Sequence, residues 1–489
     1  MAYFSKKCGI CTLLSLGGVF ITLGIVFALF WTTLYNGILT TELVLTNSSK
    51  SYQLWKDTPI PIYMNVYMFN WTNSKEVVES NWTIKPQLRE CGPYVFSEHH
   101  VRVNVSWNTE NQTVTFQQVK TWKFIPSLSN GTLNDSITNI NPIATVIGNK
   151  ARNLPVFLKE ALNLLLVKMH ETLYFTKTVG DLIFVGVDDP ILKVLDKFKV
   201  KLPFKKFGWF YSRNNSATYD GVFTMNTGKK DMNLLGDLSL WNGNANTTAY
   251  NGTCGHVNGT TGELWPPVVN REDIEIFASD ICGQLFFKHN GSETILNVEG
   301  KKFIGTDYTF DNGTKYPEQS CYQSGKVIPS GARSISVCRF GSPAYISYPH
   351  FYLGDPSYLK QVKGLKPNKT EHESHITIEP VTGITLSAKV QLQLNLYLES
   401  IEGMRVILFV IFSNIPPIYM PMIWFSQVAT LPQKYCSMTN LLVGLRSVGH
   451  YVGWIVFSIG LLMSIIGFIL IYKNNTVEEE EDHLIESEA

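Results

Sequence analysis

The chain has 489 residues, 45% of them hydrophobic, and its 41 Lys and Arg nearly balance 40 Asp and Glu, for a formal net charge of +1. This balance excludes partners that are held by a strong overall positive charge, nucleic acid among them. The total conceals a split, because one lysine faces seven acids after Tyr472, whereas 38 Lys and Arg face 33 Asp and Glu between two apolar stretches.

The first apolar stretch, Gly9–Trp31, runs for 23 residues without a charged side chain. About 20 apolar residues in a helix cross the hydrocarbon core of a bilayer, where a helix satisfies every backbone polar group. A cleaved signal peptide is the alternative, but its apolar core usually has only about 7–15 residues, followed by small residues, and Leu29-Phe30-Trp31 is bulky. We therefore expect an uncleaved anchor over residues 9–31.

Cys8 and Cys11 stand beside this anchor in the spacing C-x-x-C. A redox motif of that spacing needs a thioredoxin-like βαβ context, which the sequence lacks. Cysteines next to a membrane span are typical palmitoylation sites, with unmodified thiols as the alternative. We expect both to be palmitoylated.

The second apolar stretch, Val452–Tyr472, has 21 residues, is also uncharged and predicts a second span. Lys6 and Lys7 flank the first span and Lys473 flanks the second, so the positive-inside rule places both tails in the cytosol, although Arg446 on the outer flank weakens the signal. The expected order is a cytosolic tail (1–8), a span (9–31), an ectodomain (32–451), a span (452–472) and an acidic cytosolic tail (473–489).

N-glycosylation sequons support this orientation, because fourteen Asn-x-Ser/Thr motifs all fall between the two spans. We expect an extracellular or lumenal domain glycosylated at many of Asn47, Asn70, Asn81, Asn104, Asn111, Asn130, Asn134, Asn214, Asn246, Asn251, Asn258, Asn290, Asn312 and Asn368. Asn474 also begins a sequon, but it lies on the cytosolic side and should be unmodified.

Between the spans the pattern changes from strands to helices and back. Residues 42–130 predict short strands and residues 208–398 predict further strands, whereas residues 142–200 predict a helical insert. The clearest segments are the strands Pro59–Phe69 and Val114–Trp122 and the helices Pro155–His170, Val179–Phe184 and Pro190–Phe198. This order predicts one α+β ectodomain with a mainly antiparallel sheet or barrel.

Val406–Trp424 is apolar enough to suggest a third span. Pro416, Pro417 and Pro421 interrupt it, and a third span would place the C-terminus outside. We expect a buried final strand instead.

Six cysteines lie between the spans, and four of them fall within residues 254–338. In an oxidising compartment these four predict two disulfides, and spacing alone leaves three connectivities open.

With these residues in view, the chain resembles the class B scavenger receptors, a two-span family that includes a fatty-acid translocase, a lipoprotein receptor and a lysosomal integral membrane protein. The likeness is greatest to insect croquemort-like receptors. The matching motifs follow one another along nearly the whole chain: Pro61-Ile62-Tyr63, Phe69-Asn70-Trp71-Thr72-Asn73, Gly92-Pro93-Tyr94, Lys206-Phe207-Gly208-Trp209, Tyr219-Asp220-Gly221-Val222-Phe223, Trp265-Pro266-Pro267, Ser279-Asp280-Ile281-Cys282, Pro349-His350-Phe351 and Glu379-Pro380-Val381-Thr382-Gly383.

The resemblance implies an antiparallel β-barrel with a membrane-distal helical bundle and a lipid-conducting tunnel. It also implies the disulfides Cys254–Cys321 and Cys282–Cys338. The chain departs from the family where many members have Cys-x-Cys, because it has Cys321-Tyr322-Gln323. Cys91 and Cys436 therefore have no inherited partner, and residues 404–418 also differ.

Lys168 aligns approximately with a lysine that contacts fatty-acid carboxylates in the family, and the alternative is a solvated helix lysine. An ammonium at the mouth of an apolar channel would orient the head group, while each buried CH₂ adds about 0.8 kcal/mol. Nearby His170 would add charge at endosomal pH, although one surface histidine usually has no such role.

Six lysines within fourteen residues predict a basic face for oxidised phospholipid, phosphatidylserine or bacterial polyanions, with a solvated face as the alternative: Lys193, Lys197, Lys199, Lys201, Lys205 and Lys206. In the cytosolic tail, Glu480 stands four residues before Leu484-Ile485. That spacing fits an acidic dileucine sorting signal read by a clathrin adaptor, and a soluble acidic tail is the alternative.

Catalytic and metal-binding patterns do not emerge. His372-Glu373-Ser374-His375 lacks the H-E-x-x-H spacing of a zinc site, and there is no G-x-S-x-G elbow or P-loop, so we expect no enzyme activity, metal or cofactor. The leading hypothesis is a plasma-membrane receptor that binds lipids, lipoproteins or apoptotic and microbial particles, transfers lipid and is internalised. The alternative is a lysosomal protein that sorts an enzyme or exports lipid, and a membrane-anchored ectoenzyme is a third hypothesis.

Overall fold

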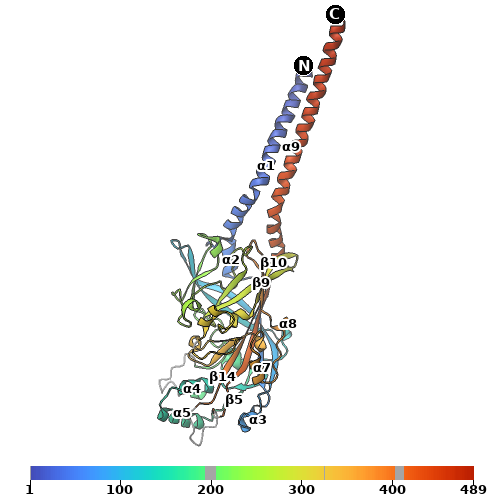
Figure 1. Ribbon diagram of the computed structural model, residues 1–489. Helices are drawn as coiled ribbons and strands as arrows, with labels where there is room; N and C mark the ends of the chain where they lie inside the picture. The colour runs from blue at the N-terminus through green and yellow to red at the C-terminus, as the bar shows by residue number, and fades with distance from the viewer. Residues whose placement is uncertain (1, 193–204, 324, 402–411, 413, 489) are drawn as a thin grey trace. The chain divides into compact units, whose positions relative to one another are not determined.

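The computed structural model describes residues 2–192, 205–323, 325–401, 412 and 414–488 (Figure 1). The chain forms two compact units. One unit combines Met1–Leu43 with Ser437–Ala489, and the other is Val44–Cys436.

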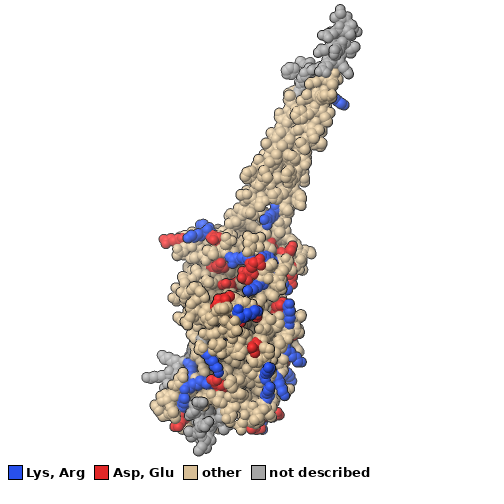
Figure 2. Space-filling view, in the orientation of Figure 1, with Lys and Arg blue, Asp and Glu red and all other residues tan. Residues whose placement is uncertain are grey.

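The first unit is a pair of long helices, α1 (Ala2–Leu43) and α9 (Gln433–Glu488). Each contains a segment long and apolar enough to cross a membrane, Cys8–Leu43 and Gln433–Val477. The expected spans 9–31 and 452–472 lie inside these helices, which continue beyond them at both ends. Figure 2 shows almost no charged side chain on the drawn face of the pair, as lipid exposure requires.

Small residues bring the backbones of α1 and α9 into contact. A Cβ atom on Gly460 would lie 2.6 Å from the Ile21 nitrogen, and one on Gly453 would lie 2.6 Å from the Ala28 nitrogen. Trp31 Nε1 also donates to the Leu445 carbonyl at 3.0 Å. Close backbone approach through glycine, with polar bonds between the helices, is how membrane helices associate without a hydrophobic driving force.

The second unit is built on a 13-stranded antiparallel sheet with the main order β7-β6-β3-β2-β1-β15-β14-β13-β10-β9-β8, and β12 joins β14 and β11 off this path. The strands are β1 Ile62–Trp71, β2 Leu88–Asn108, β3 Thr113–Phe124, β6 Val222–Asn226, β7 Leu238–Trp241, β8 Asp273–Ala278, β9 Gly283–Ile295, β10 Val298–Gly305, β11 Ala332–Ser334, β12 Ala344–Ser347, β13 His375–Ile378, β14 Thr385–Leu398 and β15 Ile418–Thr430.

The segment at Gly259 and Thr260 connects the two ends of this sheet. Leu238 of β7 donates its N–H to the Gly259 carbonyl at 2.8 Å. The Thr260 N–H donates to Glu275 of β8 at 3.0 Å, and the Phe277 N–H donates to Thr260 at 2.9 Å. Gly259 has φ 81°, which favours glycine. The sheet therefore closes into a barrel with no long free edge at this point.

The inner and outer faces of the barrel differ in how they are covered. On β14, the outward-facing Gln391 and Gln393 are completely buried, since the segment from Pro349 to His372 lies over them. The inward-facing Val390 and Leu394 remain partly exposed, as does Phe425 of β15. Val390, Leu394 and Phe425 pack against the main hydrophobic cluster, in which Leu392 and Ile423 of the same inner face are buried. The inner face therefore combines buried and partly exposed apolar side chains.

The helical insert packs as two helices and a small sheet, which lie at one end of the unit (Figure 1). The helix α4 (Pro142–Ala151) is mostly buried, and α5 (Val156–Lys168) follows it. β4 (Ser136–Ile140) then pairs with β5 (Tyr174–Thr178), which leads into a π-helical turn, Asp181–Val185.

Three sequence expectations need correction. The strands before residue 130 are not all short, because β2 has 21 residues and pairs along its length with β1 and β3. The insert is not purely helical, because β5 lies within it. The final strand begins at Ile418, and the described residues 414–417 before it are not strand, because Pro416 and Pro417 interrupt pairing. Residues 406–411 of the expected strand lie outside the described residues, and Pro421 is accommodated at a bulge beside Asn395.

Shorter helices complete the second unit: α2 Lys50–Lys56, α3 Ser74–Glu79, α7 Pro356–Gln361 and α8 Lys369–His372. The structure contains the disulfides Cys254–Cys321 and Cys282–Cys338, the two pairs that the resemblance implies. Cys91 is half-buried and Cys436 is buried, and both are free thiols.

Candidate functional site

The helix α5 presents an apolar surface to solvent. Val156, Phe157 and Leu164 are 59%, 68% and 60% exposed. Lys168 is the last residue of α5, is exposed and makes no ion pair with any described residue. These apolar side chains of α5 therefore lie outside the core, and the Lys168 ammonium lies at the end of the same helix.

Most of the predicted basic face lies outside the described residues, namely Lys193, Lys197, Lys199 and Lys201. Lys205 is exposed and Lys206 is partly buried. His170, exposed beside Lys168, has φ 56° and ends the segment after α5.

A carboxyl group joins the parts of the insert. Glu171 accepts a hydrogen bond from Asn141 Nδ2 at 2.9 Å, while the Asn141 side-chain oxygen caps α4 through the Ile143 N–H. Burial and the neighbouring Asp189 carboxylate raise the pKa of Glu171 to about 7. The proton on this pair therefore titrates near neutrality, where the beginning of α4 meets the end of α5.

Aromatic rings fill the inner side of the barrel next to the insert. Phe184, on the π-helical turn, lies 5.5 Å from Trp122 of β3 between ring centroids, and Phe210 lies 5.7 Å from Phe425. Trp122 is 5% exposed, yet its Nε1 has no hydrogen-bond partner among the described residues.

Ionisable side chains form a continuous row that begins on the inner face of β2: Arg102, Glu263, His100, Glu98, Lys120, Asp220, Arg213, Asp280 and Arg339. Burial lowers the pKa of His100 to about 4 despite the adjacent Glu98, so this imidazole is neutral at physiological pH. Four cations then face four anions, and the row carries no net charge.

A second polar cluster lies on the outer face of the barrel. Glu90 accepts hydrogen bonds from His350 Nε2 at 2.6 Å and from Trp424 Nε1 at 2.7 Å. Burial raises the pKa of Glu90, but these hydrogen bonds outweigh burial and leave the pKa below its ordinary value. His350 stacks on His372 with ring centroids 4.5 Å apart, and its Nδ1 accepts the Lys366 N–H.

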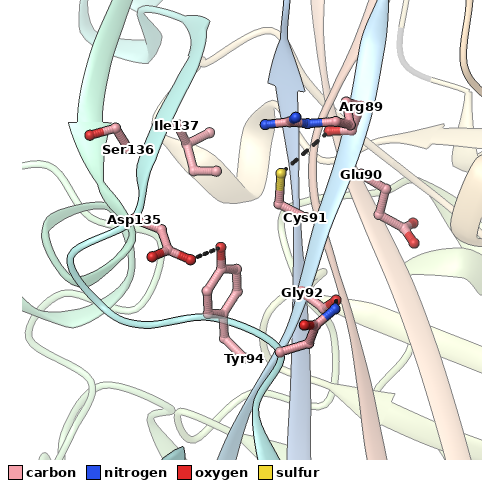
Figure 3. Close-up of a pocket in the computed structure, with 9 residues that line it drawn as sticks. Arg89, Glu90, Cys91, Gly92, Tyr94, Asp135, Ser136 and Ile137 are labelled. Atoms are coloured by element: carbon pink, nitrogen blue, oxygen red, sulfur yellow. Dashed lines mark hydrogen bonds between the residues drawn. The ribbon is translucent and has the colours of Figure 1, made fainter.

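Glu90 also borders an open cleft of about 470 Å³ (Figure 3). Tyr94 points across this cleft and donates to Asp135 at 3.1 Å, whereas Glu90 points away from Cys91. The lining carries charges of both signs and few apolar groups, so the cleft does not suit a lipid tail.

The structure also places the predicted modification sites. Twelve of the fourteen sequon asparagines are exposed, while Asn70 and Asn312 are partly buried. Asn312 donates Nδ2, the atom that carries the sugar, to the Ile328 carbonyl at 2.8 Å. Cys8 and Cys11 are exposed on α1. The backbone of Glu480, Leu484 and Ile485 is helical, and their side chains lie outside the described part of the chain.

An almost closed antiparallel barrel with a helical insert, carried between two terminal apolar helices, defines a two-span membrane protein with one large domain. A model of the CD36 family matches residues 15–471. The chain belongs to the CD36 family, and the resemblance to class B scavenger receptors is confirmed.

Several curated relatives cover most of the chain. Protein peste of Drosophila melanogaster is 31% identical over 94% of this chain and 82% of its own length. Scavenger receptor class B member 1 of Mus musculus is 33% identical over 93% of this chain and 88% of its own length. Lysosome membrane protein 2 of Rattus norvegicus is 28% identical over 87% of this chain and 86% of its own length.

Sequence reasoning missed the inner row, which includes Lys120. It also missed the nearby indole of Trp122, unpaired among the described residues, and the pair Glu171 and Asp189. The alternating pattern of β3 was the available signal for the row, since it places a lysine two residues before a tryptophan on one face. No sequence signal joins Glu171 to Asp189, because the fold of the insert brings them together.

Proposed function

We propose that the chain is a scavenger receptor that captures lipids or lipid-bearing particles at its helical insert and passes lipid through the barrel. The observation that carries this proposal is the partial exposure of the inward-facing Val390, Leu394 and Phe425. Space beside such a wall accommodates an acyl chain or a sterol body, and each buried CH₂ contributes about 0.8 kcal/mol.

The exposed face of α5 supports capture at the insert. Fatty acids, sterols, phospholipids, lipoproteins and apoptotic or microbial surfaces all offer an apolar part next to a polar or anionic head. The exposed Phe157 would contact the apolar part, and Lys168 would contact the head. Lys205 and Lys206 extend the cationic part of this proposal.

A bulky substitution on the inner face of the barrel tests whether lipid passes through it. Leu394→Trp places a larger side chain on the inner face of the barrel. It should reduce uptake of a fluorescent lipid severalfold in cells that carry the same amount of protein at their surface. Val101→Trp is the matched control, because Val101 faces outward on β2 and is partly exposed. Equal uptake by the wild type and the Leu394→Trp variant would remove the barrel as the lipid path.

Capture is tested at Lys168. Lys168→Ala should weaken fatty-acid uptake about two- to fivefold without lowering surface level, since an exposed ion pair contributes up to ~1 kcal/mol. Lys159→Ala on the same helix is the control. Unchanged uptake would exclude Lys168 from the capture site.

Both tails would face the cytosol, and the protein would reside at the plasma membrane and cycle to endosomes through its dileucine signal and a clathrin adaptor. The similarity to lysosome membrane protein 2 favours a second candidate, a lysosomal protein that sorts an enzyme or exports lipid. Biotin labelling of intact cells separates the two, because the second candidate predicts little labelled protein at steady state.

A further inference from the structure

The ammonium of Lys120, on the inner wall of the barrel, donates no hydrogen bond to a residue that the structure describes. Lys120 lies opposite His100 in the β2–β3 register and therefore faces inward. Its ammonium lies 3.9 Å from Glu98 and 4.0 Å from Asp220, too far for a hydrogen bond, and its side chain is 18% exposed. Among the described residues it donates no side-chain hydrogen bond.

Both neighbouring carboxylates already have closer partners. Glu98 is bound by His100 Nε2 at 2.5 Å, and Asp220 is bound by Arg213 at 2.9 Å. Lys120 is thus neutralised by the surrounding charges, while its three N–H groups remain available to an acceptor. A partly buried ammonium without a protein hydrogen-bond partner favours an oxygen acceptor, either a ligand or water.

Trp122 supplies a second free donor on the same face of β3. It is 5% exposed, and its Nε1 has no partner within the described part of the chain. The Trp122 ring packs against Phe184 and Phe210, and Phe210 in turn touches Phe425 on the apolar wall. Polar donors and apolar rings therefore adjoin one another inside the barrel.

We propose that Lys120 and Trp122 form a head-group site within the barrel, which takes the acceptor oxygen of a lipid with one small polar head. The apolar body of that lipid would lie along Phe425 and Leu394. Fatty-acid carboxylates and sterol hydroxyls both provide this chemistry, whereas a fully esterified lipid cannot accept as strongly. The proposal rests on the proposed passage of lipid through the barrel and specifies which lipids pass.

The test uses full-length protein in nanodiscs, with radiolabelled stearate, methyl stearate and cholesterol as probes. Lys120→Met should weaken stearate binding by about tenfold or more and leave methyl stearate nearly unchanged, because only the charged head gains a charge-assisted hydrogen bond. Trp122→Phe should weaken stearate and cholesterol. The matched control is Lys123→Met, since Lys123 is exposed on the opposite face of β3.

Lys120→Arg is the control for a structural effect of changing Lys120. It keeps the positive charge and should therefore keep the preference for stearate over methyl stearate. If Lys120→Met binds stearate like the wild type, the head-group site is wrong and the barrel path remains. If the wild type binds none of the three probes, the proposed function itself fails. Loss of cholesterol alone in Trp122→Phe would assign the site to sterols, and loss of stearate alone in Lys120→Met would assign it to fatty acids.

Discussion

The properties of individual residues in this molecule depend on the neighbours that the fold brings next to them. Glu171 has an ordinary sequence context, yet Asn141 and Asp189 surround it at the base of the insert. Lys120 looks like any strand lysine, and only the β2–β3 register turns it into the barrel. The alternation of β3 places Lys120 and Trp122 on one face, but the partners of Lys120 and the pairing of Glu171 with Asp189 depend on which distant segments are adjacent, so the sequence does not predict them.

The raised pKa of Glu171 makes the stability of the helical insert depend on pH. Its folded pKa of about 7 exceeds the ordinary value of 4.5, so the folded state binds a proton more tightly than the unfolded state. The contribution of Glu171 to the stability of the insert is then greatest below about pH 4.5 and is lost as the pH rises to about 7. Over that range the equilibrium constant for opening of the insert rises by at most about tenfold per pH unit.

Hydrogen exchange of α4 and α5 between pH 5 and pH 8, corrected for intrinsic rates, measures this effect. The wild type should open more at pH 8, and Glu171→Gln should remove most of the difference. Glu160→Gln, at an exposed position on α5, should behave like the wild type. A wild-type insert with no pH dependence would contradict the role given to Glu171.

At the scale of elements, local pattern predicted helices and strands well where they were long and periodic. Both apolar helices, α5 and β3 follow directly from their sequences. β5 was missed because its five residues, Tyr174–Thr178, are too short for a clear period and gain their stability from pairing with β4. The start of β15 was misplaced because apolar character alone does not show where pairing begins.

The contact between α1 and α9 yields a prediction about a single glycine. A Cβ on Gly24 would overlap the Phe457 backbone, so Gly24→Leu should separate the helices and lower the thermal midpoint of the full-length protein by several degrees, a loss of about 1–3 kcal/mol. Gly18→Leu is the control, because a Cβ there meets nothing within 4 Å. Equal losses from both changes would show that the effect is not one of helix packing.

At the scale of the whole molecule, the two terminal apolar helices and a mainly antiparallel sheet between them were predictable from hydropathy and strand pattern. The closure of the sheet through Gly259 was not fixed by the strand pattern, which left an open sheet and a barrel as alternatives, because it depends on pairings between strands far apart in sequence.

The glycine contacts between α1 and α9 join two helices that nearly 400 residues of chain separate. Because synthesis runs from the N-terminal to the C-terminal end of a chain, α1 is made first, and its small-residue surface has no partner until α9 follows. A chain truncated before α9 would leave that surface of α1 uncovered.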